Sequence, residues 1–157
     1  MDKYLQAIEK SKKDWQLADH MLTVTYPLVK DTKLLLPIIE KIFLSMANAM
    51  VAVLYFDRMY KRIPAFTDTL EGKFNAFKQH CVHRHNMDKS YVADMHEIKT
   101  IIVERKKSPI EFVRKDRFVI CNENYRIRTL SIGDIKSYLS KAKLFIEEME
   151  NIIKKNG

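Results

Sequence analysis

The sequence predicts a mainly α-helical fold, a bundle of about five helices with a small β-hairpin inserted before the last helix. Apolar residues recur every three or four positions over most of the 157 residues, as they do on one face of a helix. This pattern changes to short β-prone runs over 110–128, where we expect the hairpin. With only 3 glycines and 4 prolines for linkers, the chain 1–157 is predicted to form a single domain.

The first helix is predicted over 2–25 by a stripe spaced alternately by four and three residues: Tyr4, Ile8, Ser11, Trp15, Ala18 and Leu22. We expect Pro27 to end it, because proline cannot continue the hydrogen-bond ladder. The second helix is predicted to begin at Asp31 or Thr32, to include Pro37 near its start and to reach about residue 61.

This second helix is predicted to be the core helix. From Ile38 to Phe56 it is apolar nearly all round, as expected for a helix surrounded by others. Asn48 is the polar exception, and a buried amide without a hydrogen-bond partner would cost a few kcal/mol. We therefore interpret Asn48 as a residue that specifies the packing or as a site residue.

A third helix is predicted to begin at a capping box formed by Asp68 and Glu71 and to end near His83. Its stripe is Leu70, Phe74, Phe77 and Cys81. Asp88 is expected to cap a fourth helix, which ends before the Ser108-Pro109 stop and carries the stripe Tyr91, Met95, Ile98 and Ile102. The short connection between these two helices predicts that they are antiparallel neighbours.

Two β-prone runs follow at 110–113 and 118–121, joined by a turn at 114–117. In residues 125–129, arginines at 126 and 128 alternate with Tyr125, Ile127 and Thr129, which is the period of two expected for a third short strand. Ser131 and Asp134 form a capping pair for the last helix, which is predicted to run to about residue 154 along the stripe Ile135, Leu139, Ala142, Ile146, Met149 and Ile153.

The composition favours a cytoplasmic protein with an anionic partner. The net charge of +8 suits nucleic acid or an acidic protein. Cys81 and Cys121 are too few for the disulfide framework of a secreted scaffold, so we expect reduced thiols. The charged amino terminus has no hydrophobic signal segment, and the uncharged run 42–56 is shorter than the roughly 20 residues that span a bilayer. No membrane partner is expected.

The basic hairpin region is the candidate nucleic-acid surface. Residues 99–128 include nine basic and four acidic residues. Guanidinium groups can contact phosphates in pairs, and Phe112, Phe118 and Tyr125 could stack on bases. The candidate binding residues are Arg105, Lys106, Lys107, Arg114, Lys115, Arg117, Arg126 and Arg128. The alternative is a solvated turn whose charges protect a strand edge from aggregation.

The histidines are the candidate metal ligands: His80, His83, His85 and His96. A zinc site has paired ligands in two places, whereas the second place here has only His96. Cationic residues at a helix carboxyl terminus also complement the helix dipole, which is the structural alternative. The sequence has no glycine-rich phosphate loop and no nucleophile elbow. We therefore expect no cofactor and no catalytic residues.

The order of elements, with a long apolar second helix that ends in aromatic and basic residues, resembles the HEPN superfamily of small helical bundles over residues 2–105 and 131–155. Ribonucleases of that family carry an arginine followed, after four to six residues, by a histidine. No arginine from Arg58 to Arg128 has a histidine at that distance. The resemblance therefore implies a dimeric scaffold that binds a nucleotide, an RNA or a protein, without implying ribonuclease activity.

Three functions follow as hypotheses. The first is a non-catalytic module that binds RNA, DNA or another polyanion through the hairpin. The second is a structural or interaction protein that acts as a homodimer or binds a partner protein. The third is a divergent nuclease or metal enzyme that uses His80, His83, Arg84 and His85. A cleft shared by the hairpin arginines and the histidines would favour an enzyme, whereas separate faces would favour a binding module.

Overall fold

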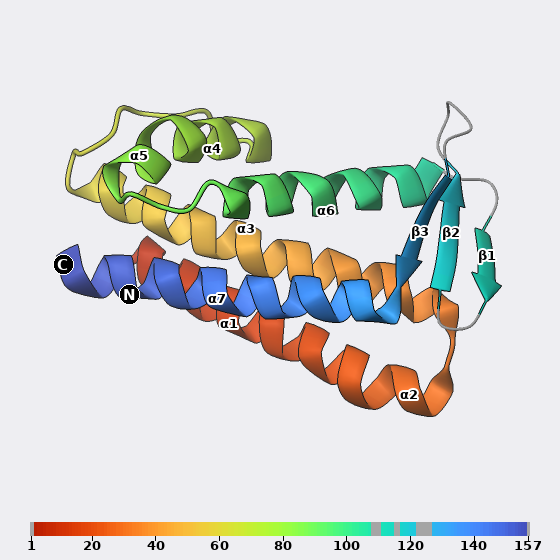
Figure 1. Ribbon diagram of the computed structural model, residues 1–157. Coiled ribbons are helices and arrows are strands. Elements are labelled where there is room, and N and C mark those ends of the chain that lie inside the picture. The colour runs from red at the N-terminus through yellow and green to blue at the C-terminus, as the bar shows by residue number, and fades with distance from the viewer. Residues whose placement is uncertain (1, 108–110, 115–116, 122–126, 157) are drawn as a thin grey trace.

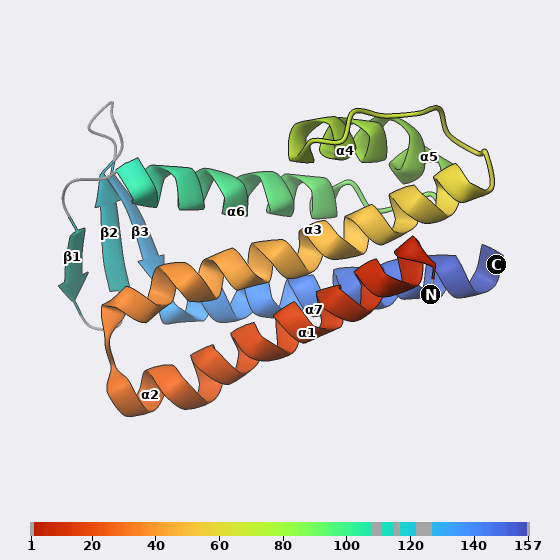
Figure 2. The ribbon, with the colours of Figure 1, turned by 180° about the vertical axis from the view of Figure 1, so that it is seen from behind.

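The computed structural model describes residues 2–107, 111–114, 117–121 and 127–156. The predicted mainly α-helical bundle with a small sheet before the last helix is confirmed (Figure 1). Its long helices are α1 (Lys3–His20), α3 (Leu35–Met59), α6 (Ser90–Lys107) and α7 (Ile132–Asn156). The same bundle seen from behind shows α1 and α7 on the side of α3 that faces away from α4 (Leu70–Ala76) and α5 (Val82–Arg84) (Figure 2).

Helix α3 is the core helix, as predicted. It packs against α1, α6 and α7, and Ile38, Met46, Met50 and Phe56 are fully buried. Three buried alanines allow close approach of its neighbours: Ala47, Ala49 and Ala52. Within the described residues, Thr32–Met59 is the one helical stretch long and apolar enough to cross a membrane. The burial of its apolar residues in the bundle is typical of the core helix of a soluble protein.

Polar contacts fix the register between α1 and α3. Ser11 is buried, and its hydroxyl donates to the carbonyl oxygen of Ser45 at 2.6 Å. The Asn48 amide donates to the carboxylate of Asp14 at 2.8 Å, and Asp14 is itself buried. Asn48 is thus a structural partner of α1, which is one of its two predicted roles.

Pro27 does not end the first helix, and that prediction is wrong. A π-helical turn at Met21–Thr25 leads into α2 (Tyr26–Val29), with Pro27 in the first turn of α2. The amide of Tyr26 bonds the carbonyl of Met21, so the hydrogen-bond ladder shifts by one residue before the proline. A first-turn proline needs no amide hydrogen. The helix ends instead at Lys30, whose φ of 52° is left-handed.

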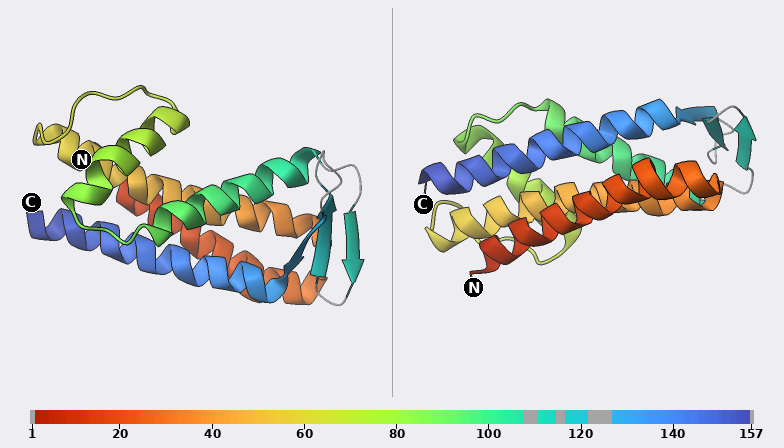
Figure 3. Two further views of the ribbon diagram at one scale, coloured as in Figure 1. Left: turned by 45° about the horizontal axis from the view of Figure 1, so that its top comes forward. Right: turned by 90° about the horizontal axis from the view of Figure 1, so that it is seen from below.

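The predicted third helix is present but interrupted. It comprises α4 (Leu70–Ala76), a π-helical turn at Phe77–Cys81 and α5 (Val82–Arg84). Its cap is Thr69, whose hydroxyl accepts from the amide of Gly72 at 3.0 Å, so the predicted Asp68 and Glu71 capping box is wrong. Asp68 instead pairs with Lys73 at 2.9 Å. The α4 to α5 segment runs antiparallel to α6, as predicted (Figure 3).

The other predicted caps are confirmed. The carboxylate of Asp31 accepts from the amide of Lys33 before α3, and that of Asp88 accepts from the amide of Ser90 at the start of α6. Ser131 and Asp134 cap α7 reciprocally, each side chain accepting from the other residue's amide at 2.9–3.0 Å. The predicted stripe of α7 is buried throughout.

The sheet contains β1 (Glu111–Arg114), β2 (Arg117–Cys121) and β3 (Ile127–Ser131), in the antiparallel order β1-β2-β3. The third strand is therefore present. Arg114 pairs with Arg117 across the turn, and Ile120 pairs with Arg128. The sheet crosses the end of the bundle where α6 ends and α7 begins, with β1 outermost (Figure 1).

Replacing Asn48 by alanine is expected to lower the free energy of unfolding by about 1–3 kcal/mol, because the buried carboxylate of Asp14 loses a hydrogen-bond donor. Urea denaturation followed by circular dichroism measures this. The exposed Asn75→Ala on α4 is the matched control and should change stability little. Equal effects of the two substitutions would contradict a structural role for Asn48.

Candidate nucleic-acid interface

The two faces of the sheet have different surroundings. Ile120 and Leu130 are 1% and 3% exposed and face the helices. Val119 is half-buried and Thr129 is exposed, on the opposite face. Since successive strand residues alternate between faces, the sheet has an inner face toward the bundle and an outer face toward solvent.

Strand register assigns the predicted binding residues to these faces. Val119 pairs with position 112, and Arg114 pairs with Arg117. Alternation therefore puts positions 112, 114 and 117 on the outer face, together with Val119 and Thr129. Two arginine positions and one phenylalanine position thus share the face that points away from the helices.

Arg128 belongs to the inner face. Its guanidinium lies 3.0 Å from the carboxylate of Glu104 and 3.7 Å from that of Glu97, both on α6. The hydroxyl of Tyr138 on α7 donates to Glu97 at 2.9 Å. Burial, followed by this hydrogen bond, raises the pKa of Tyr138 far above its usual value. Arg128 therefore joins the sheet to α6 and, through Glu97, to α7.

The other predicted binding residues lie at the end of α6 or outside the described residues. Lys106 is 59% exposed in its side chain and lies 3.7 Å from Glu40 of α3. Arg105 is half-buried and has an interaction partner. Lys107 is the last residue of α6. Lys115, Tyr125 and Arg126 lie outside the described residues.

Three lysines that the sequence analysis did not group with the hairpin lie at the same end of the bundle. Lys30 caps α2, Lys33 lies in the turn before α3, and Lys136 is in the second turn of α7. All three are exposed. The views from front and back agree that α2 ends, and α3 and α7 begin, at the end of the bundle that carries the sheet (Figures 1 and 2). Periodicity alone could not have revealed this, because it does not say which helix ends meet.

Three of the four candidate histidines, His80, His83 and His85, lie before α6, at the end opposite the sheet, and His96 lies within α6. His85 follows α5, and its Nε2 lies 2.8 Å from the carboxylate of Asp57, which is fully buried at the end of α3. Arg62 lies 3.9 Å from the same carboxylate. Burial and the neighbouring Asp57 raise the pKa of the Cys81 thiol well above its usual range. These contacts tie α5 to α3.

The other histidines do not join this pair. His83 and His96 are exposed and His80 is half-buried. Among the residues that the structure describes, no three histidine, cysteine or carboxylate side chains converge as metal ligands would. His80 to His85 precede α6 and the sheet follows it, so the length of α6 separates the two groups (Figure 1). Among the described residues, His80, His83 and His85 therefore lie apart from the sheet, whereas His96 lies within α6.

Comparisons with known proteins add no family to this geometry. The sequence matches no protein-family model and no curated protein.

Arg128→Gln is expected to lower the free energy of unfolding by about 1–2 kcal/mol, because it removes a charged hydrogen bond between the sheet and α6. In the Arg128→Gln background, Glu104→Gln should add little, since the two residues form one pair. Urea denaturation of the four proteins measures this. Strictly additive losses would show that Arg128 and Glu104 do not act together.

Proposed function

We propose that this chain is a non-catalytic binding module that contacts RNA or another polyanion with the outer face of its sheet. The observation that carries the proposal is the strand register, which assigns positions 112, 114 and 117 to the face opposite the buried Ile120. Lys30, Lys33 and Lys136 extend the positive charge beyond the sheet.

The chemistry of these residue types suits a polyanion. Arginine offers a planar fork of donors that matches two phosphate oxygens, whereas lysine supplies a point charge. An aromatic residue between them offers a stacking surface for an unpaired base. Single-stranded RNA, with accessible bases and a charged backbone, is the polyanion that uses both features.

The separation of the sheet from the histidines supports a non-catalytic role. A nuclease would need a proton donor or acceptor near the phosphate that the arginines hold. Among the described carboxylates near the sheet, Glu97 and Glu104 are paired with Arg128, Glu40 lies near Lys106, and Asp134 caps α7. The resemblance to HEPN bundles and a cytoplasmic location remain parts of this proposal.

Reversing the two outer-face arginines, Arg114→Glu with Arg117→Glu, should weaken RNA binding and reduce the slope of log K against log salt by about 1 for each phosphate that the protein no longer binds. Fluorescence anisotropy with a labelled single-stranded RNA over a series of salt concentrations measures this. The matched control reverses Arg58 and Arg84, two exposed arginines at the other end of the bundle. If both variants weaken binding equally, the effect comes from the net charge of the protein and not from the sheet. If the parent protein does not bind RNA at low salt, the proposal is refuted.

Self-association is the second candidate function, and an exposed apolar stripe favours it. Leu17, Val24 and Leu28 are 44%, 45% and 81% exposed along α1 and α2, and Met21 lies between them at helical spacing. Leu28 is the most exposed large apolar residue that the structure describes. Contiguous exposed apolar surface is typical of interaction sites.

If the stripe joins two copies, Leu28→Glu should convert a dimer into a monomer, because each partner would bury a charge. Light scattering over a range of protein concentrations measures the mass. Leu144→Glu is the matched control, since Leu144 is 58% exposed on α7, away from the stripe. A monomeric parent protein at high concentration would exclude this function.

A further inference from the structure

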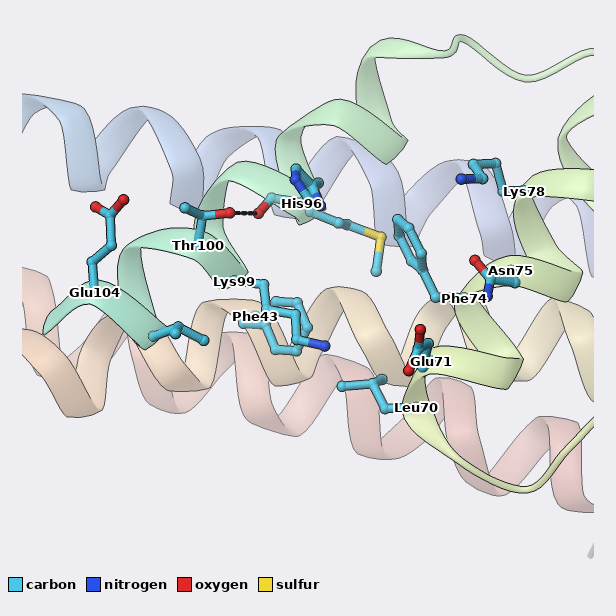
Figure 4. A pocket seen from close by; sticks show the side chains of 12 residues that line it. Phe43, Leu70, Glu71, Phe74, Asn75, Lys78, His96, Lys99, Thr100 and Glu104 are labelled. Atoms are coloured by element: carbon cyan, nitrogen blue, oxygen red, sulfur yellow. Dashed lines mark hydrogen bonds between the residues drawn. The ribbon is translucent and has the colours of Figure 1, made fainter. Parts of the chain in front are cut away.

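A cleft opens between α4 and α6, apart from the sheet. Phe43 of α3 forms part of its floor, with Leu70 and Phe74 on the α4 side and Met95 and Val103 on the α6 side (Figure 4). This compartment has a volume of about 530 Å³. Leu70 and Val103 remain 39% and 41% exposed and line the same compartment as Phe43, Phe74 and Met95. Exposed aliphatic groups in a concave site are typical of a binding surface.

A second compartment continues the cleft toward the start of α6. It has a volume of about 630 Å³ and is lined by Val82, Val92 and Ala93. Phe74, Lys78 and His96 line both compartments and divide them. The cleft therefore follows α6 from Lys89 to Glu104, a length of about 22 Å at the rise of an α-helix.

The rim of the cleft is basic. Lys78, Lys89 and Lys99 are exposed along it. Neither Lys89 nor Lys99 has a carboxylate partner among the residues that the structure describes, while Lys78 lies over the ring of Phe74 at 5.9 Å. Of the two carboxylates in the lining, Glu104 is already paired with Arg128, which leaves Glu71. The uncompensated charge at this cleft is therefore positive.

We infer that this cleft binds an acidic amphipathic helix of another protein. The walls are helix faces and offer no free strand edge, so a helix that packs side chains between them fits better than an extended peptide. The two compartments are centred about seven α6 residues apart, or roughly 10 Å. This separation matches apolar residues at i and i+7 of a helix that lies along α6, with its acidic residues against the three lysines.

Charge argues against a second copy of this chain, and the mainly aliphatic lining argues against RNA. Exposed Lys13 and Lys30 lie near the two ends of the exposed apolar stripe on α1 and α2 and carry the same sign as the cleft rim, so docking of this stripe from a second copy would be disfavoured. RNA would suit the rim, and Phe43 and Phe74 offer two rings to bases. The rest of the apolar lining is aliphatic and suits the leucines of a helix better than bases: Leu70, Val82, Val92, Ala93, Met95 and Val103. An acidic helix matches both the floor and the rim.

The test uses the full chain and a synthetic helical peptide with leucines at i, i+4, i+7 and i+11 and glutamates on its flanks. One control peptide replaces the glutamates by lysines, and another scrambles the leucines. Fluorescence anisotropy should show binding of the acidic amphipathic peptide alone. Equal binding of all three peptides, or of none, would overturn the inference.

Protein variants locate the site. Reversing Lys78 and Lys99 to glutamate should weaken peptide binding about tenfold or more, because two attractive contacts become repulsive. The matched control reverses Lys13 and Lys155, which are exposed away from the cleft. Ala93→Trp, which fills the second compartment without a charge change, should also weaken binding. Circular dichroism verifies that each variant is folded.

Other outcomes distinguish the alternatives. Loss of a dimer in the Lys78 and Lys99 variant would identify the cleft as a contact between copies, and loss of RNA binding would identify it as a nucleic-acid site; both would overturn the inference. The sheet variant Arg114→Glu with Arg117→Glu should bind the peptide normally. Peptide binding and RNA binding can therefore succeed or fail independently.

Discussion

Burial of α3 on nearly all sides is the constraint on which the rest of the structure depends. A helix that is apolar on all sides is stable only when other helices cover it, because apolar surface exposed to water is unfavourable. Helices α1, α6 and α7 cover α3. The same burial requires hydrogen-bond partners for the polar groups between α3 and its neighbours. The Ser11 hydroxyl donates to the backbone carbonyl of Ser45, and the Ser45 hydroxyl donates to the carbonyl of Ile42. The Asn48 amide donates to Asp14, and the Asp57 carboxylate bonds His85. These contacts set the position of α1 and α5 along the core helix, because a buried unpaired polar group costs about 1–3 kcal/mol.

The sheet is attached to this bundle by apolar contacts and by one arginine. Ile120 and Leu130 are buried, and Arg128 reaches Glu104 and Glu97 on α6. Fixing the inner face in this way leaves the other face of the three strands toward solvent. The positive charge of the hairpin region is thereby divided into a structural part and an outer part, and the proposed polyanion surface uses only the outer part.

The α4 to α5 segment is held at one end. The π-helical turn at Phe77–Cys81 buries Phe77 against Phe145 of α7, and the contact between His85 and Asp57 fastens the chain beyond it. The cleft lies between this segment and α6. His85, one of the four predicted metal ligands, is the residue that forms this contact, and its ring nitrogen bonds the buried carboxylate of Asp57. The surface that the anchor creates is apolar with a basic rim.

The sequence by itself determined the helical stripes, the caps at Asp31, Asp88 and Ser131, and the change to strands after α6, because these depend on periodicity and on local hydrogen bonds. Passage of the first helix through Pro27 was not predictable, since a π-helical turn shifts the ladder without any separate sequence signal. Only the tertiary structure decided that Arg128 faces inward, that Lys30 and Lys136 lie beside the sheet, and that α4 and α6 leave a cleft. Each of these depends on which helix ends meet in space, which the packing around α3 sets.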